Sequence, residues 1–218
     1  MNDGQGSSAG WLAALQEGGQ AALAEAFMDH RARLRRMVDL RLDRRVAARV
    51  DPSDVLQEAY LDASRQLEQY LANPPMSLFL WLRFLTGQRL MATHRQHLGV
   101  QKRDAKQEVA LQCRVGPEAD SHSLTCELLG PVTSPSMAAM RGEMQAALQQ
   151  VIDGLEPLDR EILALRHFEE LSNQEAAEEL HITPAAASKR YIRALERLRG
   201  VICKVPGFGQ DASGPPKE

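Results

Sequence analysis

The segment 158–199 constrains the fold of this 218-residue chain more than any other stretch. Its apolar residues recur at the spacing of an amphipathic helix as far as Phe168, and the pattern then breaks. A second short helix fits 173–180 because Ser172 and Glu175, three residues apart, make a capping-box pair at its start. The segment therefore predicts two successive short helices.

A third helix is expected directly after a tight turn at 181–182. Thr183 can cap this helix, and Pro184 occupies its first position, where the missing N–H costs nothing. Ala177 is small enough for the two helices to approach closely, and Ile182 can fill the turn. The short helix at 173–180, a turn of about three residues and the basic helix that follows the turn together predict a helix-turn-helix.

The outward face of the third helix has the character of a DNA-reading surface. Short side chains at its start would let the backbone enter a major groove, and longer basic side chains could then reach phosphates or guanine edges. The alternative is an ordinary helical hairpin whose basic face is simply solvated. The cap, the turn and the basic face all occur at the spacing of a helix-turn-helix, which favours DNA binding. The predicted DNA contacts are Thr183, Ala185, Ala186, Ser188, Lys189, Arg190 and Arg193.

The composition favours helices and limits the classes of function. Leu, Ala, Arg, Glu and Gln dominate, which is typical of an all-α chain. The net charge of −3 argues against a general nucleic-acid coat but allows a local basic face. Three scattered cysteines suit a reducing cytoplasm, and no apolar run approaches the ~18 residues of a membrane span. We therefore expect a cytoplasmic protein without a membrane span.

The helical pattern extends over the N-terminal half and then stops. Asp51 and Pro52 predict a helix start, and Asn73-Pro74-Pro75 predicts its end. Gly-Pro and Ser-Pro pairs then interrupt the periodicity. We expect two small helical domains joined by a flexible linker: a disordered N-terminus (1–9), a helical domain (10–103), the linker (104–136), the helix-turn-helix domain (137–204) and a disordered tail (205–218).

Three stretches in this order resemble a bacterial RNA polymerase sigma factor of the extracytoplasmic-function type. Residues 51–67, DPSDVLQEAYLDASRQL, resemble the helix that docks on the clamp helices of the largest polymerase subunit. Residues 77–97 resemble the Trp-containing helix beside the minus-ten element, and 158–199 resemble the region that reads the minus-thirty-five element. His181 departs from the family, which usually has glycine at this turn, so a left-handed backbone would cost about 1 kcal/mol there.

The resemblance implies a protein that directs transcription initiation, with core RNA polymerase and promoter DNA as partners and an anti-sigma factor as a possible regulator. It implies neither bond chemistry nor a cofactor. Its implied contacts to the downstream promoter element are Trp81, Arg83, Arg89 and Arg95. Its implied contacts to core polymerase are Asp54, Gln57, Glu58 and Asp62.

Several alternatives stay open on the sequence. Trp81 more often packs in a core than stacks on a base, and the Asp54–Glu58 face could simply be solvated. A helix-turn-helix regulator that is not a polymerase subunit is the main competitor, although it would need a sensing domain that this helical half does not resemble. An enzyme lacks support because no phosphate loop or nucleophile–base motif is found. Cys113, His122 and Cys126 match no closed zinc set.

Overall fold

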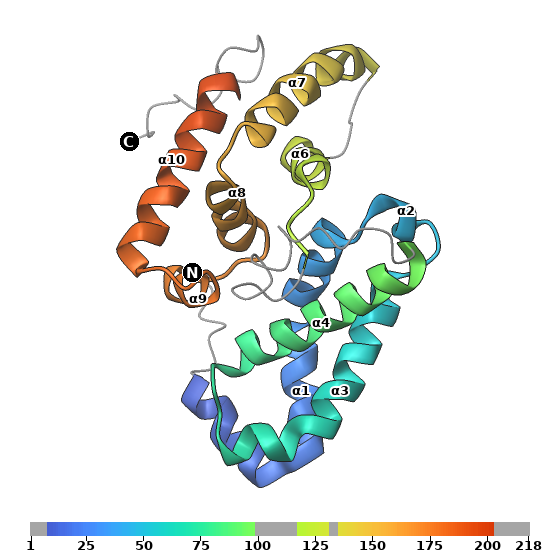
Figure 1. Ribbon diagram of the computed structural model, residues 1–218, viewed down its shortest axis with the longest axis vertical. Helices are drawn as coiled ribbons and strands as arrows, with labels where there is room; N and C mark the ends of the chain where they lie inside the picture. The colour runs from blue at the N-terminus through green and yellow to red at the C-terminus, as the bar shows by residue number, and fades with distance from the viewer. Residues whose placement is uncertain (1–7, 99–116, 131–134, 203–218) are drawn as a thin grey trace, which may run out of the picture. The chain divides into compact units, whose positions relative to one another are not determined.

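The computed structural model describes residues 8–98, 117–130 and 135–202, and every element within these ranges is a helix (Figure 1). This confirms the expected all-α class. The chain divides between Glu118 and Ala119 into two compact units, each with its own helices. We call them unit 1 and unit 2. Within the described ranges, no helix combines the length and apolar character that a membrane crossing requires.

The described part of unit 1 contains three long helices that pack against one another. They are α1 (Ser8–Arg41), α3 (Pro52–Ala72) and α4 (Leu78–Leu98), and the short helix α2 (Arg44–Ala47) joins α1 to α3. Large apolar side chains from all three fill the interior, which removes them from water and stabilises the unit. The buried set includes Leu15, Leu23, Leu34, Met37, Leu56, Leu67, Leu82, Leu85 and Leu90.

Local sequence signals explain where these helices begin and bend. Gly19 interrupts α1 with a φ of 53°, a left-handed conformation that glycine adopts without a side-chain clash, and the sequence predicts a break there. The Asp51 carboxylate accepts a 2.7 Å hydrogen bond from the Ser53 N–H, with Pro52 at the first helical position, as predicted. Ser77 lies just before α4, and its Oγ accepts a long 3.5 Å hydrogen bond from the Leu80 N–H.

The described residues of unit 2 form six helical segments, of which the last two make up the helix-turn-helix. They are α6 (Ser121–Leu129), α7 (Pro135–Asp153), α8 (Pro157–Leu163), a π-helical continuation η1 (Ala164–Phe168), α9 (Asn173–Glu179) and α10 (Pro184–Ile202). Helix α10 packs against α7, α8 and α9, and α6 packs against α7. Small residues on α10, Ala187 and Ala194, are fully buried and allow the close approach.

Helix α6 lies within the segment 104–136, for which the sequence predicts a flexible linker. The structure corrects that prediction for 121–129: Asp120 caps the helix by accepting a 2.9 Å bond from the Ser123 N–H, and Leu124 is fully buried. Thr125 and Gln149 of α7 form a 3.1 Å hydrogen bond. The nine-residue helix was missed because glycine and proline pairs flank it closely. Helix α7 begins inside the predicted linker, at Pro135, and α1 begins inside the predicted disordered N-terminus (1–9), at Ser8. Residues 1–7, the linker residues 104–116 and 131–134, and the predicted tail 205–218 lie outside the described residues.

Candidate nucleic-acid interface

The first helix of the helix-turn-helix, α9, begins at a complete capping box. The Ser172 Oγ accepts a hydrogen bond from the Glu175 N–H at 3.1 Å, and the Glu175 carboxylate accepts one from the Ser172 N–H at 2.7 Å. This reciprocal pair satisfies two backbone donors that would otherwise lack partners. The predicted cap is confirmed, and α9 therefore has a fixed starting point.

The turn between α9 and α10 is closed by hydrogen bonds to the backbone. The Ile182 N–H donates to the Ala177 carbonyl at 3.0 Å, and the Asn173 amide donates to the Pro184 carbonyl at 2.8 Å, so the start of each helix is tied to the other. His181 adopts a left-handed φ of 51°. A non-glycine residue in this conformation costs about 1 kcal/mol, which the surrounding hydrogen bonds offset.

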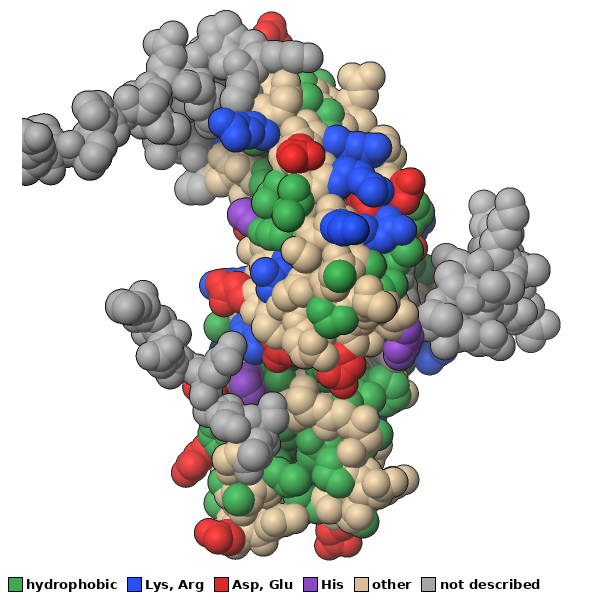
Figure 2. Space-filling view, turned by 90° about the vertical axis from the view of Figure 1, so that its left-hand side faces the viewer, with side chains coloured by type: hydrophobic (Ala, Val, Ile, Leu, Met, Phe, Trp, Pro, Cys, Tyr) green, Lys and Arg blue, Asp and Glu red, His purple; other side chains and the backbone are tan. Residues whose placement is uncertain are grey.

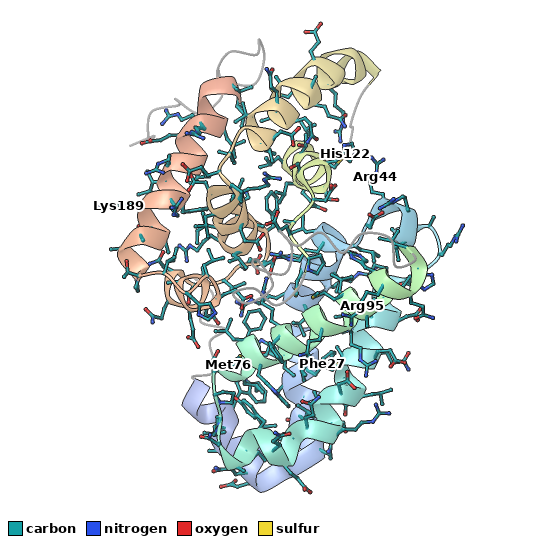
Figure 3. All side chains as sticks on the ribbon, viewed as in Figure 1. Phe27, Arg44, Met76, Arg95, His122 and Lys189 are labelled. Atoms are coloured by element: carbon teal, nitrogen blue, oxygen red, sulfur yellow. The ribbon has the colours of Figure 1, made fainter. Side chains whose placement is uncertain are left out.

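Helix α10 turns most of the predicted DNA contacts outward. Thr183 caps it, with its Oγ1 accepting a 3.2 Å bond from the Ala186 N–H. Ala185, Ser188 and Lys189 are exposed. Figure 2 shows Lys and Arg side chains gathered on the face that includes α10, and Figure 3 marks Lys189 on this helix. A basic face with short side chains at its N-terminal end is the arrangement expected of a recognition helix.

Arg190 behaves differently from its neighbours because acidic residues around the start of α8 hold it. Its Nη1 lies 2.6 Å from Asp159 Oδ1 and 3.0 Å from Glu156 Oε2. The Asp159 side chain is completely buried, and its second oxygen lies 3.6 Å from Arg193 Nη1. Arg190 is therefore tied to the body of unit 2, whereas half of the Arg193 side chain is exposed and it keeps a looser pairing.

Two of the predicted downstream contacts are enclosed in the structure. Trp81 is 5% exposed and stacks on Tyr70 with ring centroids 4.2 Å apart, and the Tyr70 hydroxyl donates to the Met76 carbonyl at 3.0 Å. Arg83 is 1% exposed. Both side chains are thus enclosed in this structure, where Trp81 holds the end of α3 against the start of α4. Their contact with DNA stays a prediction.

Arg89, another predicted downstream contact, pairs with a predicted polymerase contact. Its guanidinium donates two hydrogen bonds to the Asp62 carboxylate and lies 3.8 Å from Glu58. The sequence assigned these residues to two different partners, but the structure joins them across the α3–α4 interface. A bidentate arginine–carboxylate pair fixes the two helices relative to each other. Of the four predicted downstream contacts, Arg95 alone is exposed at residue level, on α4 (Figure 3).

The remaining predicted polymerase contacts form an exposed face on α3. Gln57 and Glu58 are exposed, and Asp54 lies beside them in the first turn of the helix. Gln57 also lines a groove of about 460 Å³ between α1 and α3, whose rim includes Met28, 67% exposed. Met28 lies away from the buried face of α1, so its place in a groove cannot be predicted from helical periodicity. The rest of the groove is lined by Ala24, Phe27, Arg31, Ser53, Leu56 and Tyr60.

A histidine ties the end of α4 to the corner after α1. The Asp43 N–H donates a 3.1 Å hydrogen bond to His94 Nε2, which must therefore be unprotonated. Burial lowers the pKa of His94, and nearby Arg45 lowers it further against the opposing charge of Asp43. The Asp43 carboxylate receives hydrogen bonds from Arg45, which hold its pKa at about 2. The neutral imidazole is thus the form that this corner requires.

The described residues contain no cluster of three or more side chains that could hold a metal ion. His122 and Cys126 of α6 do approach each other, with 3.3 Å between the ring nitrogen and the sulfur. They lie one helical turn apart, a common neighbour relationship in a helix.

Comparison with known proteins finds a family match that covers the helix-turn-helix and the helices just before it. Residues 145–198 match the family described as Sigma-70, region 4, and this range runs from the second half of α7 through most of α10. The chain is 30% identical over 165 residues to a Xanthomonas campestris pathovar campestris protein named "Probable RNA polymerase sigma factor RfaY". That alignment covers 76% of this chain and 36% of the relative, so the chain spans about a third of the curated protein's length. The helix-turn-helix of unit 2 is therefore similar to region 4 of sigma-70 factors.

Proposed function

We propose that this chain is a sigma factor of the extracytoplasmic-function type, which binds core RNA polymerase, recognises promoter DNA and directs transcription initiation. One observation carries the proposal: the segment similar to sigma-70 region 4 is the segment that folds into a capped helix-turn-helix with a basic outward face. The proposal places the protein in the cytoplasm, where the polymerase acts, and allows an anti-sigma factor as a regulatory partner.

Helix α10 would lie in the major groove of the upstream element. Ala185 and Ser188 permit close approach, while Lys189 and Arg193 provide charge for phosphates or guanine edges. Thr183 and Ala186 lie at the N-terminal end of α10, where the positive end of the helix dipole favours an anion such as a DNA phosphate. Arg190 would contribute its charge from the edge of this face, because ion pairs with Asp159 and Glu156 already fix its guanidinium.

Unit 1 would bind the polymerase and the downstream element. Asp54 and the exposed Gln57 and Glu58 suit a basic or polar docking partner, and the neighbouring groove adds apolar area. Arg95 is the predicted downstream contact with a free approach to DNA. Strand opening would be driven by binding, since stacking and phosphate contacts favour unpaired bases over the duplex. No bond is made or broken by this chain in such a mechanism.

Transcription with purified core polymerase tests the proposal. Core enzyme and the full-length protein are combined on a library of genomic fragments, and the 5′ ends of the transcripts are mapped. A sigma factor produces defined starts that depend on both components. A helix-turn-helix regulator that is not a polymerase subunit would bind DNA without core enzyme and would create no new starts, and that result would exclude the proposal.

Charge reversal at Asp54 and Glu58 provides the matched test of docking. The double variant Asp54→Lys, Glu58→Lys should reduce recovery of core enzyme with the tagged full chain. Charge reversal at Glu178 is the control, because this residue is also exposed but lies on α9 of unit 2. Unchanged recovery of core enzyme by the double variant would remove this face from the proposed interface.

A further inference from the structure

Ile192 is a large apolar side chain that α10 leaves in solvent, with 52% of its surface exposed. Single exposed apolar residues are common on proteins, so exposure alone assigns nothing. We propose that Ile192 is a specificity-determining residue that packs on the C5-methyl group of a thymine in the upstream element. The inference rests on the proposed function, in that it requires α10 to lie in a major groove.

The position of Ile192 on the helix supports this assignment. It follows the fully buried Ala187 by five residues, which at about 3.6 residues per turn places it about 140° away from the core. Ile192 therefore lies near the middle of the outward face. A duplex that approaches this face opposite the core would therefore lie against Ile192.

The neighbours of Ile192 leave room for a base edge. Ser188 lies one turn earlier on the same face and Ala185 two turns earlier, and both are short and exposed. Lys189 projects beside them and can hold a phosphate at the groove wall. The nearest long cation toward the core, Arg190, is held away by its ion pairs to acidic residues of unit 2. Ile192 thus follows two short side chains, with Lys189 beside them, and the exposed Glu196 lies one turn after it.

The chemistry of the major groove selects the ligand. Thymine alone among the four bases presents an apolar group there, its C5-methyl, whereas the other edges present hydrogen-bond donors and acceptors. An isoleucine side chain can exclude water from a methyl group but cannot satisfy those polar edges. Its β-branch also restricts the first side-chain torsion in a helix, so little conformational freedom is lost when the two groups meet.

Deoxyuridine, which lacks only the methyl group, tests the proposed contact directly. Duplexes are selected from a random library by the full-length chain, once alone and once bound to core polymerase. Each thymine in the selected motif is then replaced singly by deoxyuridine. For the wild type, one replacement should weaken binding by about fourfold, the loss expected for one buried methyl group. For Ile192→Ala that same replacement should have no effect, and Leu98→Ala, which removes another exposed apolar side chain, should keep the wild-type penalty.

Each other outcome overturns the inference. An equal deoxyuridine penalty in the wild type and in Ile192→Ala would assign the methyl group to another residue. No penalty at any thymine, or no selected motif, would show that Ile192 does not read DNA. Transcript mapping with core polymerase separates these failures from failure of the proposed function, because defined starts can persist without a thymine contact. Circular dichroism checks that each variant is folded. Alanine is a good helix former, so the substitutions should leave the helices intact.

Discussion

Arg190 of α10 donates a 2.6 Å hydrogen bond to Asp159 of α8, a carboxylate with no solvent exposure. A buried charge without a partner is costly, so this arginine stabilises the fold of unit 2 whether or not it touches DNA. Glu156 adds a second, more exposed pairing at 3.0 Å. The pair joins the helix that leads into the helix-turn-helix to the helix that would read DNA.

Removal of Arg190 should therefore destabilise the protein. Arg190→Ala is expected to lower the free energy of unfolding by about 2–3 kcal/mol, because it leaves the Asp159 carboxylate buried without its closest cation. Urea denaturation followed by circular dichroism measures the change. Arg197→Ala is the matched control on the same helix: its side chain makes one long 3.4 Å bond to the Gly154 carbonyl, and a decrease of about 0.5 kcal/mol is expected. Equal decreases would contradict the structural role of Arg190.

Lys189 and Arg193 should matter for DNA more than for stability. The double variant Lys189→Ala, Arg193→Ala removes two cations from the outward face, so the slope of log binding constant against log salt should fall by about one for each phosphate that no longer has a cation beside it. Binding of the polymerase complex to an upstream duplex over a salt series measures the slope. Recovery of core enzyme should stay unchanged. An unaltered slope would show that these side chains do not meet phosphates.

Asp62 and Arg89 should behave as one unit that holds α3 to α4. The single variants Asp62→Ala and Arg89→Ala are expected to destabilise by similar amounts, and the double variant by less than their sum, with a coupling energy of about 1 kcal/mol. The partial exposure of both side chains keeps this value modest. Urea denaturation of the four proteins gives the cycle. Strict additivity would show that the two residues act separately, as the sequence-based assignment to different partners implies.

His94 should make the protein less stable in mild acid. Burial lowers its pKa in the folded state, so the unfolded chain binds the proton more readily, and stability is lost as the pH falls below the ordinary histidine value of 6.5 toward the lowered one. His94→Gln keeps an acceptor for the Asp43 N–H but does not titrate. Between about pH 7.5 and about pH 5 the wild type should lose more unfolding free energy than this variant. Asp43, with a pKa of about 2, stays charged across that window. Parallel curves would refute the assignment.

The sequence predicts the elements well where a local signal exists. The capping box of α9, the Asp51 cap of α3 and the break at Gly19 each depend on residues a few positions apart, and each is confirmed. Helix α6 was missed because glycine and proline pairs flank it closely, and because its packing against α7 is a contact between segments distant in the sequence. Long-range packing of this kind leaves little trace in a short window.

The side-chain assignments at the candidate sites show the same limit. The sequence shows that Arg190, Arg89 and Trp81 are placed on helices, but not which neighbour each side chain meets. Asp159 is 31 positions from Arg190, and Asp62 is 27 from Arg89. These partners become visible when the helices pack. The exposed basic positions of α10 needed only helical periodicity, which explains why Lys189 was placed correctly on the outward face.

Footprinting of a start-site fragment tests the central claim that two helical units grip two separate stretches of promoter DNA as parts of one polymerase complex. Full-length protein and core enzyme are bound to the fragment together and separately, and hydroxyl-radical cleavage is mapped. The account predicts two protected segments, one near the start and one upstream, that appear when both components are present, with the upstream segment missing in the Lys189→Ala, Arg193→Ala variant. The same protection with core enzyme alone, or a single segment that the variant leaves unchanged, would contradict it.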